Sequence, residues 1–194
     1  MEPILSLRAN VNESQAQRLL RPWRVRGLRV ELLRAIAAVY VPYRLHRVEI
    51  ANNERTESRL LAIDGVEGSL DLYGFASVPA EEELISLLTP NRLPSILDEA
   101  AGRNLLVERA RRMCFRQGFF RVRDLRITVT AALIELHVPH WVGFYGPEND
   151  LTLAALNAVR RSIEGRKLTS VLRKWLVSPN YSRPAAPVAV PHFD

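Results

Sequence analysis

Hydrophobic and polar residues alternate over residues 125–131, which is the clearest local pattern in the chain. Every second residue from Leu125 to Ala131 is apolar, whereas the residues between them are Arg126, Thr128 and Thr130. Side chains at alternate positions of a strand share one face. We therefore expect a strand here that buries one face and exposes the other.

Helix signals precede this strand and occur again near the N-terminus. Asn12, followed three residues later by Gln15, is typical of a capping box and predicts a short helix that ends near Leu20. A second helix is predicted over residues 105–117, because apolar residues recur there at helical spacing and Gly118 follows.

The chain repeats itself with a spacing of 97 residues. Residues 24–29 read RVRGLR and residues 121–126 read RVRDLR, so five of six positions are identical. The alignment runs without a gap from 21–74 onto 118–171. This period is too long for a solenoid repeat, so we interpret the chain as two copies of one module.

Each copy is expected to continue from its helix into an antiparallel meander. The segment 30–40 is ambiguous by propensity, but its counterpart 127–137 is rich in β-branched residues and favours a strand. A Val-Pro pair, ending at Pro42 and at Pro139, is expected to interrupt the strand because proline cannot donate a ladder hydrogen bond. Further strands are predicted over residues 43–50, 56–63, 69–75, 140–145 and 151–159.

The remaining segments define the expected domain boundaries. Helices are predicted over residues 79–88, 94–101 and 168–176. The predicted organisation is a first repeat module at 1–78, an acidic helical linker at 79–103, a second repeat module at 104–177 and a proline-rich tail at 178–194. The expected fold class is α+β, with two homologous helix-plus-antiparallel-meander modules related by a pseudo-twofold axis.

Composition adds a net charge of +6, and 25 of the 27 basic residues are arginine. The arginines concentrate in residues 18–47 and 103–126, whereas residues 54–102 are acidic. Surfaces of opposite sign could pair within the molecule or across a homodimer. Nucleic-acid binding through the arginine-rich segments is therefore a first alternative function.

Other features of the composition narrow the setting and the chemistry. Cys114 is the single cysteine, which excludes an internal disulfide and fits a reducing compartment. We find neither an export signal nor the run of about 18 apolar residues that a membrane span needs, and we expect a cytoplasmic protein without a membrane partner. Enzyme motifs for phosphate, nucleophile or dinucleotide chemistry are missing from the sequence, so we favour a non-catalytic protein without a cofactor.

The repeated arginines and the aromatic residues near the Val-Pro pairs are the candidate binding residues. Two arginine trios that converge could hold phosphate or carboxylate groups. Amphipathic rings could line a groove at a sheet margin. The candidates are Arg24, Arg26, Arg29, Arg121, Arg123, Arg126, Tyr40, Tyr43 and Trp141.

His137 and His140, with Glu135 nearby, suggest a second alternative, a metal-binding protein or a hydrolase. Imidazole and carboxylate groups are common zinc ligands. However, residues three apart on a strand face opposite sides. The first copy has Tyr40 and Tyr43 at the two histidine positions, which favours a structural role for all four rings.

The segment Leu60–Leu70, LLAIDGVEGSL, resembles the closing hairpin strand of PepSY-like domains, in which a strand runs into an Asp-x-x-x-Gly turn. The resemblance covers about one hairpin per copy, and the ungapped alignment places Arg161 where the first copy has Asp64. The same alignment matches Glu67-Gly68 with Glu164-Gly165, where we expect turns. The periplasmic or membrane-associated setting of that family does not match this chain, but the resemblance implies a non-catalytic regulatory or binding module.

Together these patterns predict a non-catalytic binding or interaction protein. Its partner would be a protein or a small acidic ligand, bound at an arginine-lined surface or in a groove between the modules. We expect such a surface to be more apolar than that of an ordinary monomer.

Overall fold

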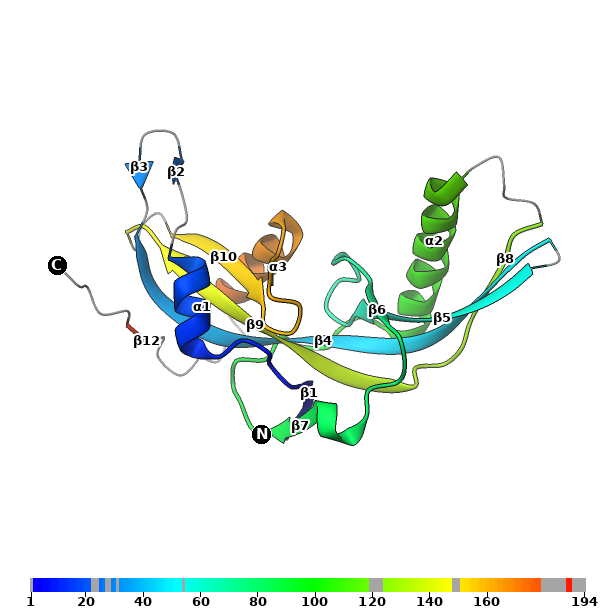
Figure 1. Cartoon of the computed structure of the whole chain (residues 1–194), viewed down its shortest axis with the longest axis horizontal. Coiled ribbons are helices and arrows are strands. Elements are labelled where there is room, and N and C mark those ends of the chain that lie inside the picture. The colour runs from blue at the N-terminus through cyan, green and yellow to red at the C-terminus, as the bar shows by residue number, and fades with distance from the viewer. Residues whose placement is uncertain are drawn as a thin grey trace. The chain divides into compact units, whose positions relative to one another are not determined.

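The computed structural model describes residues 2–21, 25–26, 29–30, 32–53, 55–118, 124–147, 151–178 and 188–189; of residues 25–26, 29–30, 117–118 and 188–189 it describes the backbone alone. The helices are α1 (Glu13–Leu20), α2 (Glu99–Gly118) and α3 (Arg166–Leu176). The strands are β1 (Ile4–Leu7), β2 (Val25–Arg26), β3 (Arg29–Val30), β4 (Leu33–Asn52), β5 (Arg55–Asp64), β6 (Tyr73–Phe75), β7 (Leu84–Leu87), β8 (Arg126–Val129), β9 (Ile134–Tyr145), β10 (Thr152–Asn157), β11 (Ser162–Ile163) and β12 (Val188–Ala189). Helices combined with a large mixed sheet make the α+β class that the sequence predicted (Figure 1).

The large sheet has the strand order β11-β10-β9-β4-β5-β6, and the chain forms two compact units. Unit 1 comprises residues 1–41, 84–93 and 137–194, and unit 2 comprises residues 42–83 and 94–136. Strands β4 and β9 each contribute residues to both units. Each unit therefore collects segments from both halves of the chain, whereas the sequence suggested modules that are contiguous.

In unit 1, α1 packs on β9 and β10. The helix begins with the predicted capping box: the N–H of Gln15 donates to the Asn12 side chain at 2.9 Å, and the N–H of Asn12 donates to the Gln15 side chain at 3.1 Å. Leu20 is fully buried in a core that includes Tyr145 and Leu156. The Tyr145 hydroxyl also donates to the Leu20 carbonyl oxygen at 2.7 Å, which ties the end of α1 to β9.

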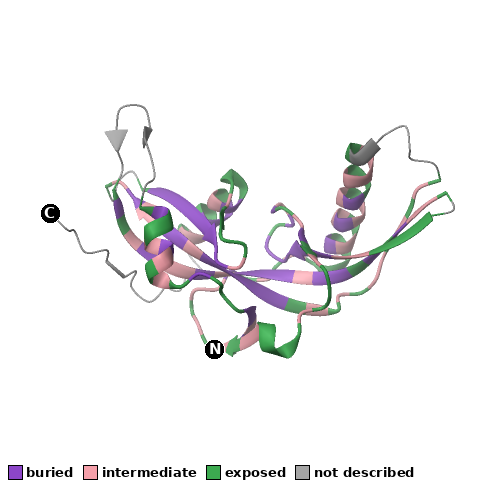
Figure 2. Ribbon diagram, in the orientation of Figure 1, coloured by how far each residue is buried: buried purple, intermediate pink, exposed green. Residues whose placement is uncertain are grey.

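In unit 2, α2 packs on β4, β5 and β8. Leu106 and Ala110 are fully buried and share a core with Val48 and Ile63. Figure 2 shows buried positions along β4 and on α2. The alternation predicted over 125–131 is confirmed for 125–129, because the apolar residues there pack against this core while the polar ones between them are exposed. It fails beyond β8, where Ala131 is exposed and residues 130–133 separate β8 from β9.

The two prolines lie inside β4 and β9, so the prediction that they interrupt these strands was wrong. The pairing of β4 with β5 reaches Tyr43, and the pairing of β9 with β10 reaches His140. Pro42 and Pro139 therefore stand one position outside these ladders. A missing N–H costs no ladder hydrogen bond at that place, which is why the strand can continue through the proline.

Two predicted helices take other forms. Residues 79–88 form one turn of 3-10 helix and then β7, which pairs antiparallel with β1. The helix expected over 94–101 is wrong for residues 94–98, which are not helical. Residues 99–101 are the start of α2, which runs through Gly102 without ending there. The side chain of Asp98 accepts the N–H of Ala101 at 3.0 Å and so caps α2.

Candidate functional site

A pocket of about 400 Å³ lies beside α3 in unit 1. This volume falls in the usual range for sites that bind small ligands. Its lining comes from α3, from the start of β10, and from β11 with the two residues that follow it. All of these elements belong to unit 1, so the pocket is a property of that unit alone.

One wall of the pocket is a polar face of α3. The helix predicted over residues 168–176 is confirmed and begins two residues earlier. One side of α3 is buried in the core: Leu168, Val171 and Leu172. Another side lines the pocket with residues spaced one helical turn apart: Arg166, Thr169, Ser170 and Arg173. The guanidinium group of Arg173 donates to the carbonyl oxygen of Leu151 at 3.3 Å. This contact holds the side chain near the residue that precedes β10.

The floor of the pocket is apolar. Leu153 of β10, which is 5% exposed, and Ile163 of β11 contribute apolar side chains, with Thr152 beside them. Ala154 also borders the pocket, but its side chain packs in the core of unit 1 with Leu20 and Tyr145. The pocket thus places guanidinium and hydroxyl groups on one wall and hydrocarbon beneath them.

Glu164 lines the same pocket, and two buried residues contact its carboxylate. Its Oε1 atom accepts a hydrogen bond from Asn157 Nδ2 at 3.0 Å and lies 3.7 Å from His140 Nε2. Asn157 and His140 are 1% and 2% exposed. The His140 Nδ1 atom lies 3.0 Å from the Val138 carbonyl oxygen.

These partners act on the charge of Glu164. The nearby His140 ring is the main cause that holds the pKa of the Glu164 carboxyl below its usual value, and Asn157 and the positive charge of Arg160 act in the same direction. Burial acts against this shift but does not reverse it. Glu164 is therefore ionised at neutral pH, and a fixed negative charge stands at the edge of the pocket.

The histidine motif does not form one site. His137 Nδ1 lies 3.3 Å from the Leu5 carbonyl oxygen, whereas His140 faces Glu164. Glu135 belongs to unit 2, where it accepts hydrogen bonds from Arg44 at 2.8 Å and Ser95 at 3.0 Å. Within the described ranges, no group of three or more His, Cys, Asp or Glu residues is arranged to hold a metal ion.

The arginine trios fall largely on parts of the chain that the structure does not describe. Arg24, Arg121 and Arg123 lie outside the described residues. Of Arg26 in β2 and Arg29 in β3 only the paired backbone is described. Arg126 is exposed on β8. The binding role of this set stays a prediction.

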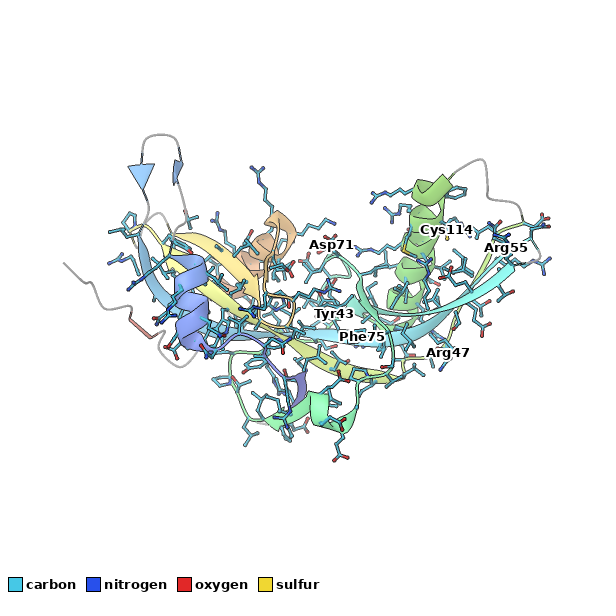
Figure 3. All side chains as sticks on the ribbon, viewed as in Figure 1. Tyr43, Arg47, Arg55, Asp71, Phe75 and Cys114 are labelled. Carbon is cyan, nitrogen blue, oxygen red and sulfur yellow. The ribbon has the colours of Figure 1, made fainter. Side chains whose placement is uncertain are left out.

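The aromatic candidates are packed into the units. Tyr43, marked in Figure 3, is 5% exposed, and its ring meets that of Tyr73 edge to face at 5.9 Å. Burial raises the pKa of the Tyr40 hydroxyl. Trp141 packs against the core of unit 1 and donates from Nε1 to the Val11 carbonyl oxygen at 2.8 Å. Each ring has a packing role, and its part in binding stays a prediction.

Sequence reasoning missed the residues that form the pocket. Glu164 was expected only as part of a turn, and the helix predicted over 168–176 was given no role in binding. A signal was available, because Arg166, Thr169, Ser170 and Arg173 recur at helical spacing. Nothing local indicates that Glu164 meets His140 and Asn157, since that contact depends on how β9, β10 and β11 pair.

In comparisons with known proteins, no family model, no curated protein and no solved structure matches this chain. Among the described residues, no helix combines the length and the apolar character that crossing a membrane requires.

Proposed function

We propose that this chain is a non-catalytic binding protein, built from two copies of one module, that holds a small anionic ligand in the pocket beside α3. The observation that carries this proposal is the arrangement of Arg166 and Arg173 with two hydroxyl groups on one wall of that pocket. Guanidinium groups bind carboxylates and phosphates through paired, charge-assisted hydrogen bonds. We favour binding over catalysis because His140, the partner of Glu164, is 2% exposed and lies behind it.

Strand pairing supports the duplicated module. In each copy, the residue directly after the proline is the first of its strand to pair with the following strand. Tyr43 pairs with Asp64 in one copy, and His140 pairs with Asn157 in the other. Asp64 and Asn157 therefore occupy corresponding positions, which introduces a four-residue gap into the alignment.

The turns after these two residues provide a second line of support. Oδ1 of Asp64 accepts backbone N–H groups up to four residues ahead, and Oδ1 of Asn157 accepts those two and three residues ahead. Four residues after each of them, the backbone is left-handed: φ is 63° at Gly68 and 57° at Arg161. The two turns thus share their side-chain contacts and their unusual backbone position.

The segments that precede α1 and α2 make corresponding backbone hydrogen bonds. The N–H of Asn10, ahead of α1, donates to Ala158 O at 2.8 Å, and the N–H of Ile96, ahead of α2, donates to Gly65 O at 2.8 Å. Gly65 and Ala158 directly follow the two corresponding turn residues. On this interpretation each unit combines the helix of one copy with the hairpin of the other copy, and the pseudo-twofold relation stays a prediction.

Replacing Arg161 by glycine should raise the free energy of unfolding by about 0.5–1 kcal/mol, because a non-glycine residue is strained at positive φ. The corresponding change Gly68→Ala should have the opposite sign, since a Cβ atom there would also lie 2.8 Å from Leu105 Cδ1. Urea denaturation of both variants measures the two effects. Equal signs would argue against the correspondence of the two turns.

The binding proposal is tested by titrating the protein with short-chain carboxylates and with inorganic phosphate, using calorimetry. Arg166→Ala and Arg173→Ala should each weaken binding by about tenfold or more, since each removes a charge-assisted contact. Arg55→Ala, an exposed arginine of unit 2 (Figure 3), is the matched control and should leave affinity unchanged. If no compound that carries a carboxylate or a phosphate group binds to the wild-type protein at millimolar concentration, the proposal is wrong.

A further inference from the structure

We infer that the pocket beside α3 selects a zwitterion, namely an α-amino acid with a small aliphatic side chain. This inference rests on the proposed function, because it names the ligand class of the same pocket. It adds a role for Glu164, which a pocket for simple anions would not need.

The charges of the lining point to a ligand with both signs. Arg166 and Arg173 are exposed on the α3 wall, and Glu164 presents an ionised carboxylate to the same pocket. A simple anion would gain from the arginines but would be repelled by Glu164. A ligand that carries an ammonium group beside its carboxylate would complement both.

Glu164 is placed as a preorganised acceptor rather than as a mobile surface carboxylate. Its backbone N–H donates to Ala155 O at 2.8 Å, and its side chain is anchored by Asn157 at 3.0 Å and faces His140 at 3.7 Å. The side chain nevertheless stays 27% exposed toward the pocket. Groups that are fixed before binding lose little entropy when they meet a ligand, so this anchoring favours recognition of a cation.

The apolar floor accounts for the rest of the ligand. Ile163, which is 36% exposed, offers most of the accessible apolar surface, and Leu153 adds a small part because it is 5% exposed. Inorganic ions would leave this hydrocarbon surface unused, whereas an aliphatic side chain would cover it. The hydroxyl groups of Thr169 and Ser170 can accept from an ammonium group or donate to a carboxylate.

Matched ligands test this inference on the wild-type protein. We would compare leucine, 4-methylpentanoate (which lacks the ammonium group), 3-methylbutylamine (which lacks the carboxylate) and inorganic phosphate by calorimetry. Leucine should bind about tenfold or more tightly than either truncated ligand. The acid offers no ammonium group to Glu164, and the amine offers no carboxylate to the arginines. Phosphate should bind more weakly than leucine.

The variant Glu164→Gln keeps the size of the side chain and its amide oxygen for Asn157 but removes the charge. It should lower affinity for leucine by about tenfold and leave the affinity for 4-methylpentanoate unchanged or higher. Glu108→Gln, at an exposed glutamate of α2, is the control and should change neither. If Glu164→Gln does not fold, the comparison of ligands on the wild-type protein decides alone.

The outcomes separate this inference from the proposed function. If 4-methylpentanoate or phosphate binds as tightly as leucine, the zwitterion is wrong and the pocket is an anion site. If none of the four compounds binds, both the ligand class and the proposed function fail. Selective binding of leucine that depends on Glu164 supports both.

Discussion

Replacing Asp64 by alanine should lower the free energy of unfolding by about 3–5 kcal/mol, the largest effect that we expect from a single polar residue of unit 2. Asp64 is fully buried, and its carboxylate accepts four backbone N–H groups. The distances range from 2.8 Å to Leu70 N to 3.3 Å to Val66 N. Alanine would leave these donors without an acceptor in a site that water reaches poorly, and each such donor costs about 1–3 kcal/mol.

Thermal and urea denaturation would measure this loss, and a fall in melting temperature of roughly 10 °C is expected for a chain of this size. Asp64→Asn is a graded variant, because it keeps Oδ1 for three donors but turns an amide group toward the N–H of Leu70. It should fall between wild type and Asp64→Ala. Glu81→Ala, at an exposed acid of unit 2, serves as the control. An Asp64→Ala variant as stable as this control would show that the turn does not depend on the carboxylate.

The sequence predicted those elements whose signals are local. The capping box at Asn12 and the alternation over 125–129 depend on neighbouring residues only, and both are confirmed. The strands β5 and β10 were placed within two residues of their ends for the same reason. The composition of 79–88 misled us, because its run of glutamates suits a helix, whereas pairing with β1 makes its last part a strand. Tertiary pairing overrides weak local preference.

The site could not be predicted because it depends on register. The chain advances 21 positions from Tyr43 to its partner Asp64. It advances only 17 positions from His140 to its partner Asn157, so the second hairpin is shorter by four residues. Hairpin connections vary in length at little cost in free energy, but they shift every later position of an ungapped alignment. For this reason the ungapped alignment sets Arg161 against Asp64, whereas the correspondence that we propose sets Asn157 against it.

The register that we propose would also explain why the pocket lies in only one of the two proposed copies. Seven residues after Asp64 stands Asp71, and seven residues after Asn157 stands Glu164, so an acid follows both turns. In one copy the chain then enters the short strand β6, and in the other it enters α3 with its arginines. If the module was duplicated, the binding site belongs to the part in which the copies have diverged.

Truncation of Leu20 to alanine should destabilise unit 1 by about 3–5 kcal/mol. Leu20 is fully buried at the end of α1, in a core with Ile36, Tyr145 and Leu156. Removal of a buried leucine loses its transfer free energy and leaves a cavity. An eight-residue helix is not stable in water by itself, so α1 depends on this packing.

The neighbouring residue supplies the control. Leu19 is 40% exposed, and Leu19→Ala should change the free energy of unfolding by less than about 1 kcal/mol. The hydrogen bond from Tyr145 goes to the backbone carbonyl of residue 20, so it is available in both variants and does not confound the comparison. Urea denaturation gives the two free energies, and amide exchange in β10 reports whether unit 1 loosens. Equal losses in the two variants would mean that α1 does not dock on β9 and β10 through Leu20, and the core assigned to unit 1 would have to be revised.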